Sequence, residues 1–249
     1  MPTHEAEAIV LRQYSLADAD RIIVFVTREY GKIRAVGRGV KKTKSRLAAC
    51  LEPLNHIRLR FYAKEGADLC RILQCETVHT YLGKTPSLEQ IYGFSYFAEI
   101  IQEFVEENNP NPLFFRLFLA VLNTGETQGI GEALIRYFEF WTLKLSGLLP
   151  NYDSCSKCGK YVKDDGFYAW IESGEGRCRS CGGNKGVWIQ PAAAETLRRL
   201  AEPPERFVRL ELPEPAGRDL ERLAQKLLEL HLERRLKSYP ALREMLRGR

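Results

Sequence analysis

Four of the seven cysteines stand in two Cys-x-x-Cys pairs, and this spacing constrains the fold more than any other feature of the chain. The pairs are Cys155 with Cys158 and Cys178 with Cys181, and 19 residues lie between them. Two pairs at this distance are typical of a zinc ribbon, in which four thiolates bind one metal ion in a closed tetrahedral shell. Because a closed shell leaves no position for a substrate, we predict one structural Zn²⁺ per chain.

An iron–sulfur cluster and a redox dithiol are the alternatives to zinc. A single pair would suffice for redox work, and so compact a ribbon does not need a cluster. Each pair is followed by a glycine, Gly159 or Gly182, which suits a tight turn whose backbone N–H groups are directed at the sulfurs. Between the pairs, GFYAWI (Gly166 to Ile171) has the pattern of a strand with aromatic side chains that shield a small site.

The first 80 residues have the pattern of short β-strands. We predict five of them, over residues 6–14, 21–27, 32–36, 55–62 and 69–77. Gly31 predicts a hairpin turn between the second and third strands. Five short strands with a long loop after the third are typical of a small closed barrel. The OB-fold is the first choice for such a barrel, and an SH3-like barrel is the alternative.

The net charge changes sign along the chain, although the formal total is only +5. Residues 1–82 carry +5, residues 83–150 carry −4 and residues 151–249 carry +4. The densest cationic run extends from Arg34 to Arg46 and contains no acidic side chain. Such a run indicates a polyanion-binding loop, although a solvated loop has the same composition. Its cations are Arg34, Arg38, Lys41, Lys42, Lys44 and Arg46.

From residue 87 onward the apolar residues recur with a helical period. Ser87 and Gln90 form a capping box before a stretch that is apolar on most faces, which predicts a buried helix. Asn111 and Pro112 are residue types favoured at a helix start, and they predict a second helix that runs through Leu122 and stops before Gly125. Further helices are predicted over residues 130–146, 191–202 and 216–237.

These segments together predict a multidomain α+β protein. Its parts are an N-terminal OB-fold barrel over residues 1–82, an α-helical domain over residues 83–150 and 187–249, and a four-cysteine zinc ribbon over residues 151–186. The ribbon is predicted to be an insertion in the helical domain.

The sequence carries none of the common signatures of a catalytic site. It has no GxxxxGK[ST] phosphate loop, no HExxH or GxSxG motif and no zinc-deaminase signature. It also has no apolar run of about 18 residues and no signal-peptide pattern at its start. Nothing in the sequence therefore supports an enzyme, although an enzyme is not excluded, and we predict no membrane partner. We expect the protein in the reducing cytoplasm, where cysteines bind metals rather than form disulfides.

The order of barrel, basic loop, helices, ribbon and further helices resembles the RecO family of bacterial recombination mediators over essentially the whole chain. Similar strings are EAIVLRQYSLADADRIIVFVTREYGKIRAVGRGVKKTKS in the barrel, RYFEFWTLKLSGLLPNYDSC (Arg136 to Cys155) before the ribbon, and Leu236-Lys237-Ser238. One departure is the segment from Ser15 to Arg21, where family members often have a Gly-Glu-type turn before an Asp-Arg pair. We expect it to alter the turn and not the function.

The resemblance implies an OB domain followed by a helical domain that a zinc ribbon interrupts. It also implies a non-enzymatic, nucleoid-associated protein that binds single- and double-stranded DNA and anneals complementary strands without ATP. With RecR as a partner, such a protein helps to load recombinase onto DNA coated by single-strand-binding protein (SSB). Its place is then recombinational DNA repair.

On this interpretation the DNA lies across the barrel, where the six cations of the basic run neutralise phosphates. The outward face of the strand over residues 55–62 adds Arg58, Arg60 and Tyr62 as predicted DNA contacts. Tyr62 would stack on bases, and its alternative role is to cover the barrel exterior.

SSB tails are acidic and end in apolar residues, so their C-terminal tail needs a cation beside an apolar groove. Arg136 with Tyr137 and Phe140 is the predicted partner-binding group. Two other function classes stay open. A metal-dependent nuclease would use the ribbon to grip DNA and would need Mg²⁺, and an RNA-binding factor would prefer RNA in competition with single-stranded DNA.

Overall fold

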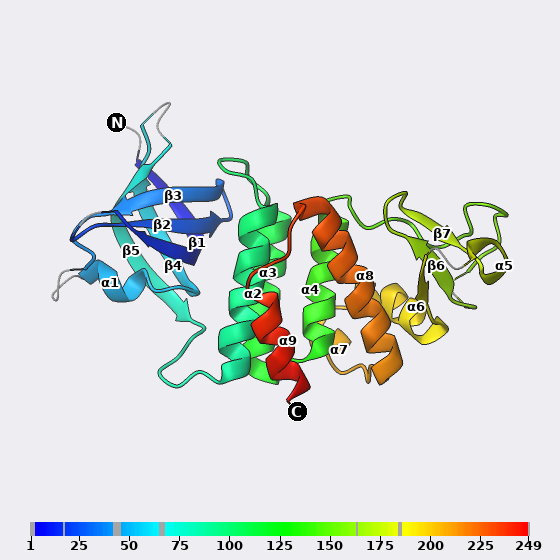
Figure 1. Ribbon diagram of the computed structural model, residues 1–249. Helices are drawn as coiled ribbons and strands as arrows, with labels where there is room; N and C mark the ends of the chain where they lie inside the picture. Colours follow the sequence, from blue (N-terminus) through cyan, green and yellow to red (C-terminus); the bar gives the residue numbers. More distant parts are fainter. Residues whose placement is uncertain are drawn as a thin grey trace. The chain divides into compact units, whose positions relative to one another are not determined.

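The computed structural model of the protein describes residues 3–16, 18–41, 46–64, 68–162, 164–183 and 186–248 (Figure 1). The chain divides into two compact units, Met1–Asn123 and Thr124–Arg249. The first unit holds the barrel and two long helices, the second of which crosses the boundary between the units. The predicted division into barrel, helical and ribbon domains stays a prediction.

The N-terminal part of the chain is a five-stranded closed barrel. Its strands are β1 (Thr3–Ser15), β2 (Arg21–Thr27), β3 (Gly31–Gly37), β4 (Asn55–Tyr62) and β5 (Cys70–Thr80). Their order around the barrel is β1-β2-β3-β5-β4, and all pairs are antiparallel except β3 with β5. This is the predicted OB-fold arrangement. The ends of each strand lie within three residues of the predicted ones.

Alternating side chains of the strands fill the barrel. Ile57, Leu59 and Phe61 point inward and are at most 2% exposed, as their alternation predicts. Between β3 and β4, the short helix α1 (Arg46–Cys50) contributes Cys50 to the same core.

Gly31 closes the hairpin between β2 and β3, as predicted, with a left-handed φ of +67°. A Cβ atom at this position would lie 2.1 Å from the Asn109 carbonyl oxygen. We expect Gly31→Ala to lower the free energy of unfolding by about 2–4 kcal/mol, because backbone strain and a clash with backbone act together.

Denaturant unfolding measures this change, and Gly83→Ala is the matched control. Gly83 has no left-handed φ, and a Cβ atom there meets nothing within 4 Å. The control should therefore change the unfolding free energy by less than about 0.5 kcal/mol. Equal effects of the two substitutions would refute this account of Gly31.

The helix α2 (Leu88–Phe104) begins with the predicted capping box. The Ser87 hydroxyl accepts a hydrogen bond from the Gln90 backbone N–H at 3.2 Å, and the Gln90 side chain accepts one from Ser87 N–H. The segment after this helix pairs with the start of β3, where the Lys32 N–H donates to the Glu106 carbonyl at 3.1 Å. Backbone hydrogen bonds therefore join the barrel to the end of α2.

The helix α3 (Pro112–Gln128) is longer than predicted. It continues through Gly125, whereas the sequence predicted that it stops before this glycine. A glycine inside a helix costs only about 1 kcal/mol relative to alanine. Burial of Phe118 and Leu122, both fully enclosed, stabilises the helix by more than that amount.

The second unit combines helices with a small three-stranded sheet. Its elements are α4 (Glu132–Leu145), β6 (Phe167–Trp170), β7 (Glu175–Arg177), α5 (Arg179–Gly182), β8 (Val187–Ile189), α6 (Pro191–Arg198), the 3₁₀ turn η1 (Arg199–Ala201), α7 (Pro204–Phe207), α8 (Glu214–Leu232) and α9 (Tyr239–Arg247). The helix predicted over residues 216–237 is confirmed as α8 up to Leu232, but its predicted end is wrong. The helix stops there because Glu233 takes a left-handed φ of +53°, and α9 follows separately. Among the described residues, no helix is both long and apolar enough to span a membrane.

Candidate metal centre and nucleic-acid surface

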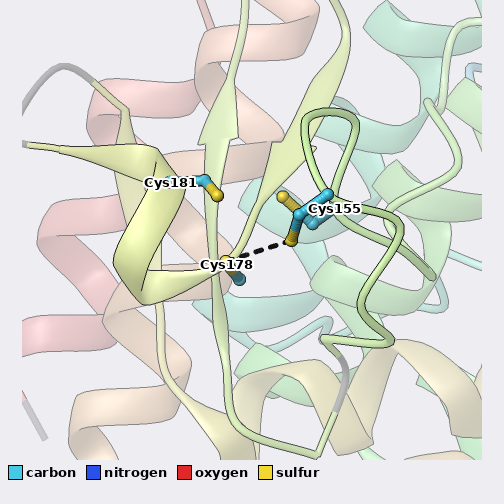
Figure 2. A group of neighbouring side chains, drawn as sticks. Cys155, Cys178 and Cys181 are labelled. Atoms are coloured by element: carbon cyan, nitrogen blue, oxygen red, sulfur yellow. Dashed lines mark hydrogen bonds between the residues drawn. The ribbon is translucent and has the colours of Figure 1, made fainter.

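The two cysteine pairs meet at one place in the second unit. All four sulfur atoms lie within 4.8 Å of one another, and Cys158 Sγ is 3.8 Å from Cys178 Sγ. Cys155, Cys178 and Cys181 turn their sulfurs toward one another (Figure 2). A tetrahedral Zn²⁺ with Zn–S bonds of about 2.3 Å would hold its sulfurs about 3.8 Å apart. The four side chains therefore have the donor set and the spacing for a four-coordinate metal ion.

Backbone N–H groups stabilise a thiolate at Cys155. Burial acts to raise the pKa of this thiol, but hydrogen bonds from the backbone at Cys178, Cys158 and Lys157 outweigh burial and lower the pKa to about 6. The pKa of Cys181 is instead raised to about 12, because its thiol hydrogen-bonds to the neighbouring sulfur of Cys178. Since thiolates are the metal ligands, binding a cation here would release the remaining protons.

Both cysteine pairs form the tight turns that their glycines predict. The Gly159 N–H donates to the Cys155 carbonyl, and the Gly182 N–H donates to the Cys178 carbonyl, both at 2.8 Å. Gly182 is also required by packing, because a Cβ atom there would lie 2.3 Å from the Tyr168 ring. The turns bring each pair of sulfurs to the same side of the chain.

Aromatic side chains cover the small sheet around the centre, as predicted for the segment between the cysteine pairs. The sheet has the order β7-β6-β8. Tyr152 stacks on Phe167 with ring centroids 4.9 Å apart, and Tyr168 packs on Trp188 at 4.8 Å. These rings supply a core that so small a sheet could not otherwise build.

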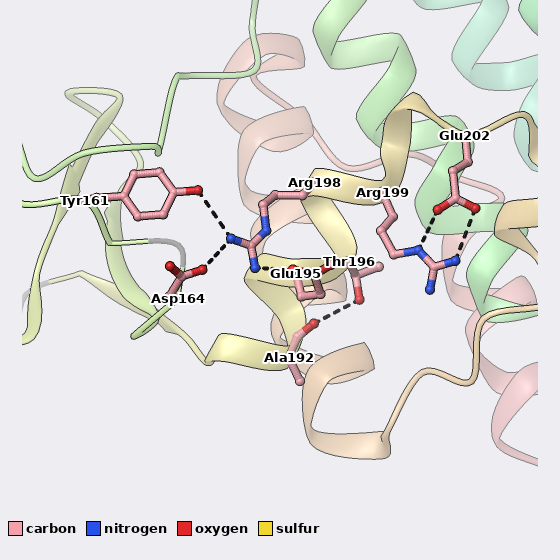
Figure 3. A network of polar contacts seen from close by, with 8 residues as sticks. All are labelled: Tyr161, Asp164, Ala192, Glu195, Thr196, Arg198, Arg199 and Glu202. Carbon is pink, nitrogen blue, oxygen red and sulfur yellow. Dashed lines mark hydrogen bonds and ion pairs between the residues drawn. The ribbon is translucent and has the colours of Figure 1, made fainter.

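An arginine of α6 attaches the ribbon to the helices of the second unit (Figure 3). The Arg198 guanidinium donates to Asp164 at 2.5 Å and to the Tyr161 hydroxyl at 3.3 Å, and it also pairs with Glu195. Asp164 and Tyr161 lie between the two cysteine pairs in the sequence. The metal centre is therefore anchored to α6 by a charged hydrogen-bond network.

In the first unit, a row of outward-facing side chains crosses all five strands of the barrel. The strand register places Tyr14 opposite Ile22, Ile22 opposite Val36, Val36 opposite Arg71, and Arg71 opposite Tyr62. Residues opposite one another share a face of the sheet, and all five are exposed or half-buried. Two tyrosines with aliphatic side chains and an arginine between them suit sequence-independent stacking of bases.

Two further arginines flank this row. Arg12 and Arg34 lie on either side of Val24 in the register, and the Arg12 guanidinium is 5.0 Å from the centre of the Tyr14 ring. Arg34 pairs with Glu107 at 3.0 Å, and its side chain is 41% exposed. The row and its flanking arginines are called the barrel face below.

The basic loop leaves the barrel directly after β3. Arg38 and Lys41 are exposed, and the Gly39 N–H donates to the Asp20 carboxylate at 2.8 Å, which holds the loop against the turn before β2. Outside the described residues lie Lys42, Lys44 and the side chain of Arg46. The described part of the loop therefore adds two cations beside the barrel face.

Arg58 and Arg60 have more acidic surroundings than the other predicted DNA contacts. Both line a hollow of about 500 Å³. Arg58 lies opposite Glu7 and Glu76, and Arg60 pairs with Glu5 at 3.6 Å. The hollow's carboxylates, which outnumber its two arginines, are Glu5, Glu7, Glu29 and Glu76. DNA contact at Arg58 and Arg60 stays a prediction, and the charge of this hollow does not favour it.

The predicted partner-binding group is enclosed within the second unit. Arg136, Tyr137 and Phe140 are 3%, 5% and 1% exposed, and Arg136 Nε pairs with the buried Glu139 carboxylate at 3.1 Å. Burial also raises the pKa of Tyr137 to about 12. The helix was expected to present a cation beside an open apolar groove. Because these side chains face inward, the described structure does not support them as a docking surface.

Sequence reasoning missed five of the seven residues of the barrel face, namely Arg12, Tyr14, Ile22, Val36 and Arg71. Arg12 and Tyr14 alternate with inward residues near the end of β1, which was a usable signal. Arg71 could be placed only once β5 was paired in parallel with β3. The cross-strand register therefore supplies what a single strand pattern does not.

Fold and sites together define a protein class: an OB-barrel protein with a basic loop, helices and a four-cysteine metal-binding ribbon. Comparison with known proteins gives the family. The family model described as "Recombination protein O N terminal" matches residues 1–81, and "Recombination protein O C terminal" matches residues 86–240. The chain belongs to the recombination protein O (RecO) family, as the sequence resemblance predicted.

Curated relatives support this assignment, and two of them match the chain over nearly its full length. The chain is 30% identical over 237 residues to "DNA repair protein RecO" of Koribacter versatilis (strain Ellin345), covering 93% of this chain and 95% of that protein. It is 33% identical over 242 residues to the protein of the same name from Pelotomaculum thermopropionicum, covering 96% and 93%. A third relative of that name, from Cutibacterium acnes, is 34% identical over 177 residues, covering 67% of this chain and 70% of that protein.

Proposed function

We propose that this chain is a non-enzymatic DNA-binding mediator of recombinational repair that anneals complementary strands without ATP. The observation that carries the proposal is the barrel face, where exposed Tyr14 and half-buried Tyr62 share a row with Arg71 beside the basic loop. The names of the relatives, which are DNA repair proteins, support the same function.

Annealing on such a surface follows from charge and stacking. Two complementary strands repel one another through their phosphates, and cations on the protein neutralise them and release counterions. Tyrosine rings hold bases by stacking, which every base allows because each has a π face. Duplex formation itself supplies the free energy, so no nucleotide hydrolysis is needed.

The metal in this proposal is one structural Zn²⁺ per chain. Cys155, Cys158, Cys178 and Cys181 would hold it, and the closed thiolate shell gives it no catalytic position. Its contribution is to fold the ribbon, which Arg198 then fixes to α6.

The finer part of the proposal follows the family resemblance. Single- and double-stranded DNA, RecR and the C-terminal tail of SSB are the proposed partners, and loading of recombinase onto SSB-coated DNA is the proposed role. The tail requires a cation beside an exposed apolar groove, and the burial of the group around Arg136 does not favour that group as its docking place.

Tyr14 provides a specific test of the barrel face. We expect Tyr14→Ala to weaken single-stranded DNA binding between about fivefold and about 150-fold, because base–aromatic stacking contributes roughly 1–3 kcal/mol per base. Tyr14→Phe keeps the ring and should bind within about twofold of the wild type. Fluorescence anisotropy of a labelled oligonucleotide measures the DNA affinity of both variants. Equal binding by Tyr14→Ala and wild type would show that Tyr14 does not contact DNA.

Competition separates the proposal from the other function classes. A labelled single-stranded DNA is bound to the protein and then displaced by unlabelled single-stranded DNA, duplex DNA or RNA of the same length. The proposal predicts displacement by both DNAs and intact strands on a denaturing gel, with or without Mg²⁺. Preferential displacement by RNA would favour the RNA-binding factor, and shortened strands that Mg²⁺ chelation prevents would favour the nuclease.

A further inference from the structure

A groove between α8 and α9 in the second unit carries a high density of positive charge. Its volume is about 510 Å³, and its floor and walls come from α8, the turn after it and α9. Its cations, all exposed, are Arg218, Arg222, Lys226, Arg235, Arg243 and Arg247. Among the described residues, two carboxylates line the same groove, those of Glu221 and Glu229.

Half of these six cations make no ion pair with a described carboxylate. Glu221 pairs with Arg243 at 2.7 Å, and Glu229 pairs with Arg235 at 3.0 Å. Arg218 pairs with a carboxylate outside the groove. Within the described parts of the chain, the groove cations that make no ion pair are Arg222, Lys226 and Arg247. A ligand that enters the groove therefore meets cations that no described carboxylate neutralises.

The cations form two rows. On α8, Arg218, Arg222 and Lys226 follow one another at intervals of four residues, which is about 6 Å along a helix. On α9, Arg243 and Arg247 have the same interval. Charges repeated along two helices match a linear polyanion better than a single anion.

The described groove does not suit an acidic peptide that ends in apolar residues. Its buried leucine, Leu236, is only 4% exposed, and Tyr239 is half-buried with its hydroxyl donating to Glu221 at 2.7 Å. None of the groove residues is among the exposed large hydrophobic side chains of the described chain. A peptide of that kind needs an apolar pocket, whereas a phosphodiester backbone needs only cations.

We propose that the groove between α8 and α9 binds the phosphodiester backbone of a DNA strand, as a second site in addition to the barrel face. This inference takes DNA as the polymer from the proposed function, and so rests on it. It goes further because a chain with two DNA sites can hold two strands. The groove would contribute phosphate contacts without stacking, so binding there should be insensitive to base sequence.

Four full-length proteins test the inference with fluorescein-labelled dT30. They are the wild type, a loop variant (Arg38→Gln/Lys41→Gln/Lys42→Gln/Lys44→Gln), a groove variant (Arg222→Gln/Lys226→Gln), and a variant that combines both sets. Arg206→Gln/Arg209→Gln, placed in the loop-variant chain, is the matched control, because it removes the same number of exposed charges from the second unit outside the groove. Circular dichroism and zinc content confirm that each protein is folded.

In the loop-variant chain, we expect the groove substitutions to lower the remaining affinity about tenfold and the salt slope by about 1.4, because two phosphate contacts are lost. The control should change neither by more than about a third of those amounts. Equal effects of groove and control substitutions would overturn the inference. So would groove substitutions that spare dT30 but weaken binding of an acidic peptide with an apolar end.

The same proteins keep this inference separate from the proposed function. If the loop substitutions leave dT30 binding unchanged and the groove substitutions abolish it, the proposed DNA site on the barrel is wrong and DNA binding in the groove is supported. If the loop substitutions alone abolish all dT30 binding, the DNA site on the barrel is supported and the inference of a DNA site in the groove is overturned.

Discussion

A Cys155→Ser/Cys178→Ser chain should lose its zinc completely and melt about 10 °C lower than the wild type, an effect that corresponds to a few kcal/mol for a chain of this size. The physical reason is that the ribbon has a sheet of only three short strands, so the free energy of metal binding is also its folding free energy. Loss of the ribbon would also break the contacts of Arg198 with Asp164 and Tyr161.

Elemental analysis of freshly purified protein and a thermal scan measure these two effects. Cys75→Ala is the matched control, because Cys75 lies half-buried against the barrel core and outside the metal centre. It should keep one zinc per chain. A double-serine chain that still holds one zinc, or a wild type that folds normally with none, would contradict the metal assignment.

The loop variant should show the largest loss of DNA affinity. Removal of four phosphate contacts is expected to lower the salt slope by about 2.8 and the affinity for single-stranded DNA roughly 100- to 1,000-fold at 0.1 M salt. Arg38 and Lys41 of this loop are exposed beside the barrel face.

Anisotropy titrations at several salt concentrations give both quantities. Arg58→Gln/Arg60→Gln is the control, because these arginines share their hollow with four carboxylates. Per charge removed, the control should have a much smaller effect than the loop variant. An equal effect per charge would show that net charge, and not the basic loop, governs binding.

The metal centre and the barrel could be predicted from the sequence because their signals are local. Two cysteine pairs with glycines behind them specify turns, ligands and a closed shell within a few residues. The alternation in β4 specifies which side chains, such as Leu59 and Phe61, are buried. Neither inference depends on how distant segments pair.

The charge environment of the barrel could not be predicted from one strand. Arg58 and Arg60 look like part of a basic surface in β4, but Glu5, Glu7 and Glu76 reach the same hollow from other strands. The register also brings Tyr14 and Arg71 into the row that contains Tyr62. Both facts depend on strand pairing, which the sequence does not display.

The helical segments show a second reason why the sequence alone does not predict every site. Because α4 is apolar on most faces, its sequence pattern does not show to which side the Arg136 side chain points. In the fold this side chain is buried and paired with Glu139. The groove between α8 and α9 could not be predicted, because the sequence predicted one helix over residues 216–237 and none over the residues of α9. A left-handed turn at Glu233 separates the two, and it lies at a residue without the glycine that usually marks such a turn.

Annealing of two complementary oligonucleotides, one of them dye-labelled, tests the central claim most directly. The reaction contains no nucleotide, is followed with wild type and loop variant at several salt concentrations, and is analysed on a denaturing gel. The account predicts faster duplex formation by the wild type, suppression by salt, a slower rate with the loop variant, and intact strands. No acceleration by the wild type, or strands that become shorter, would contradict it.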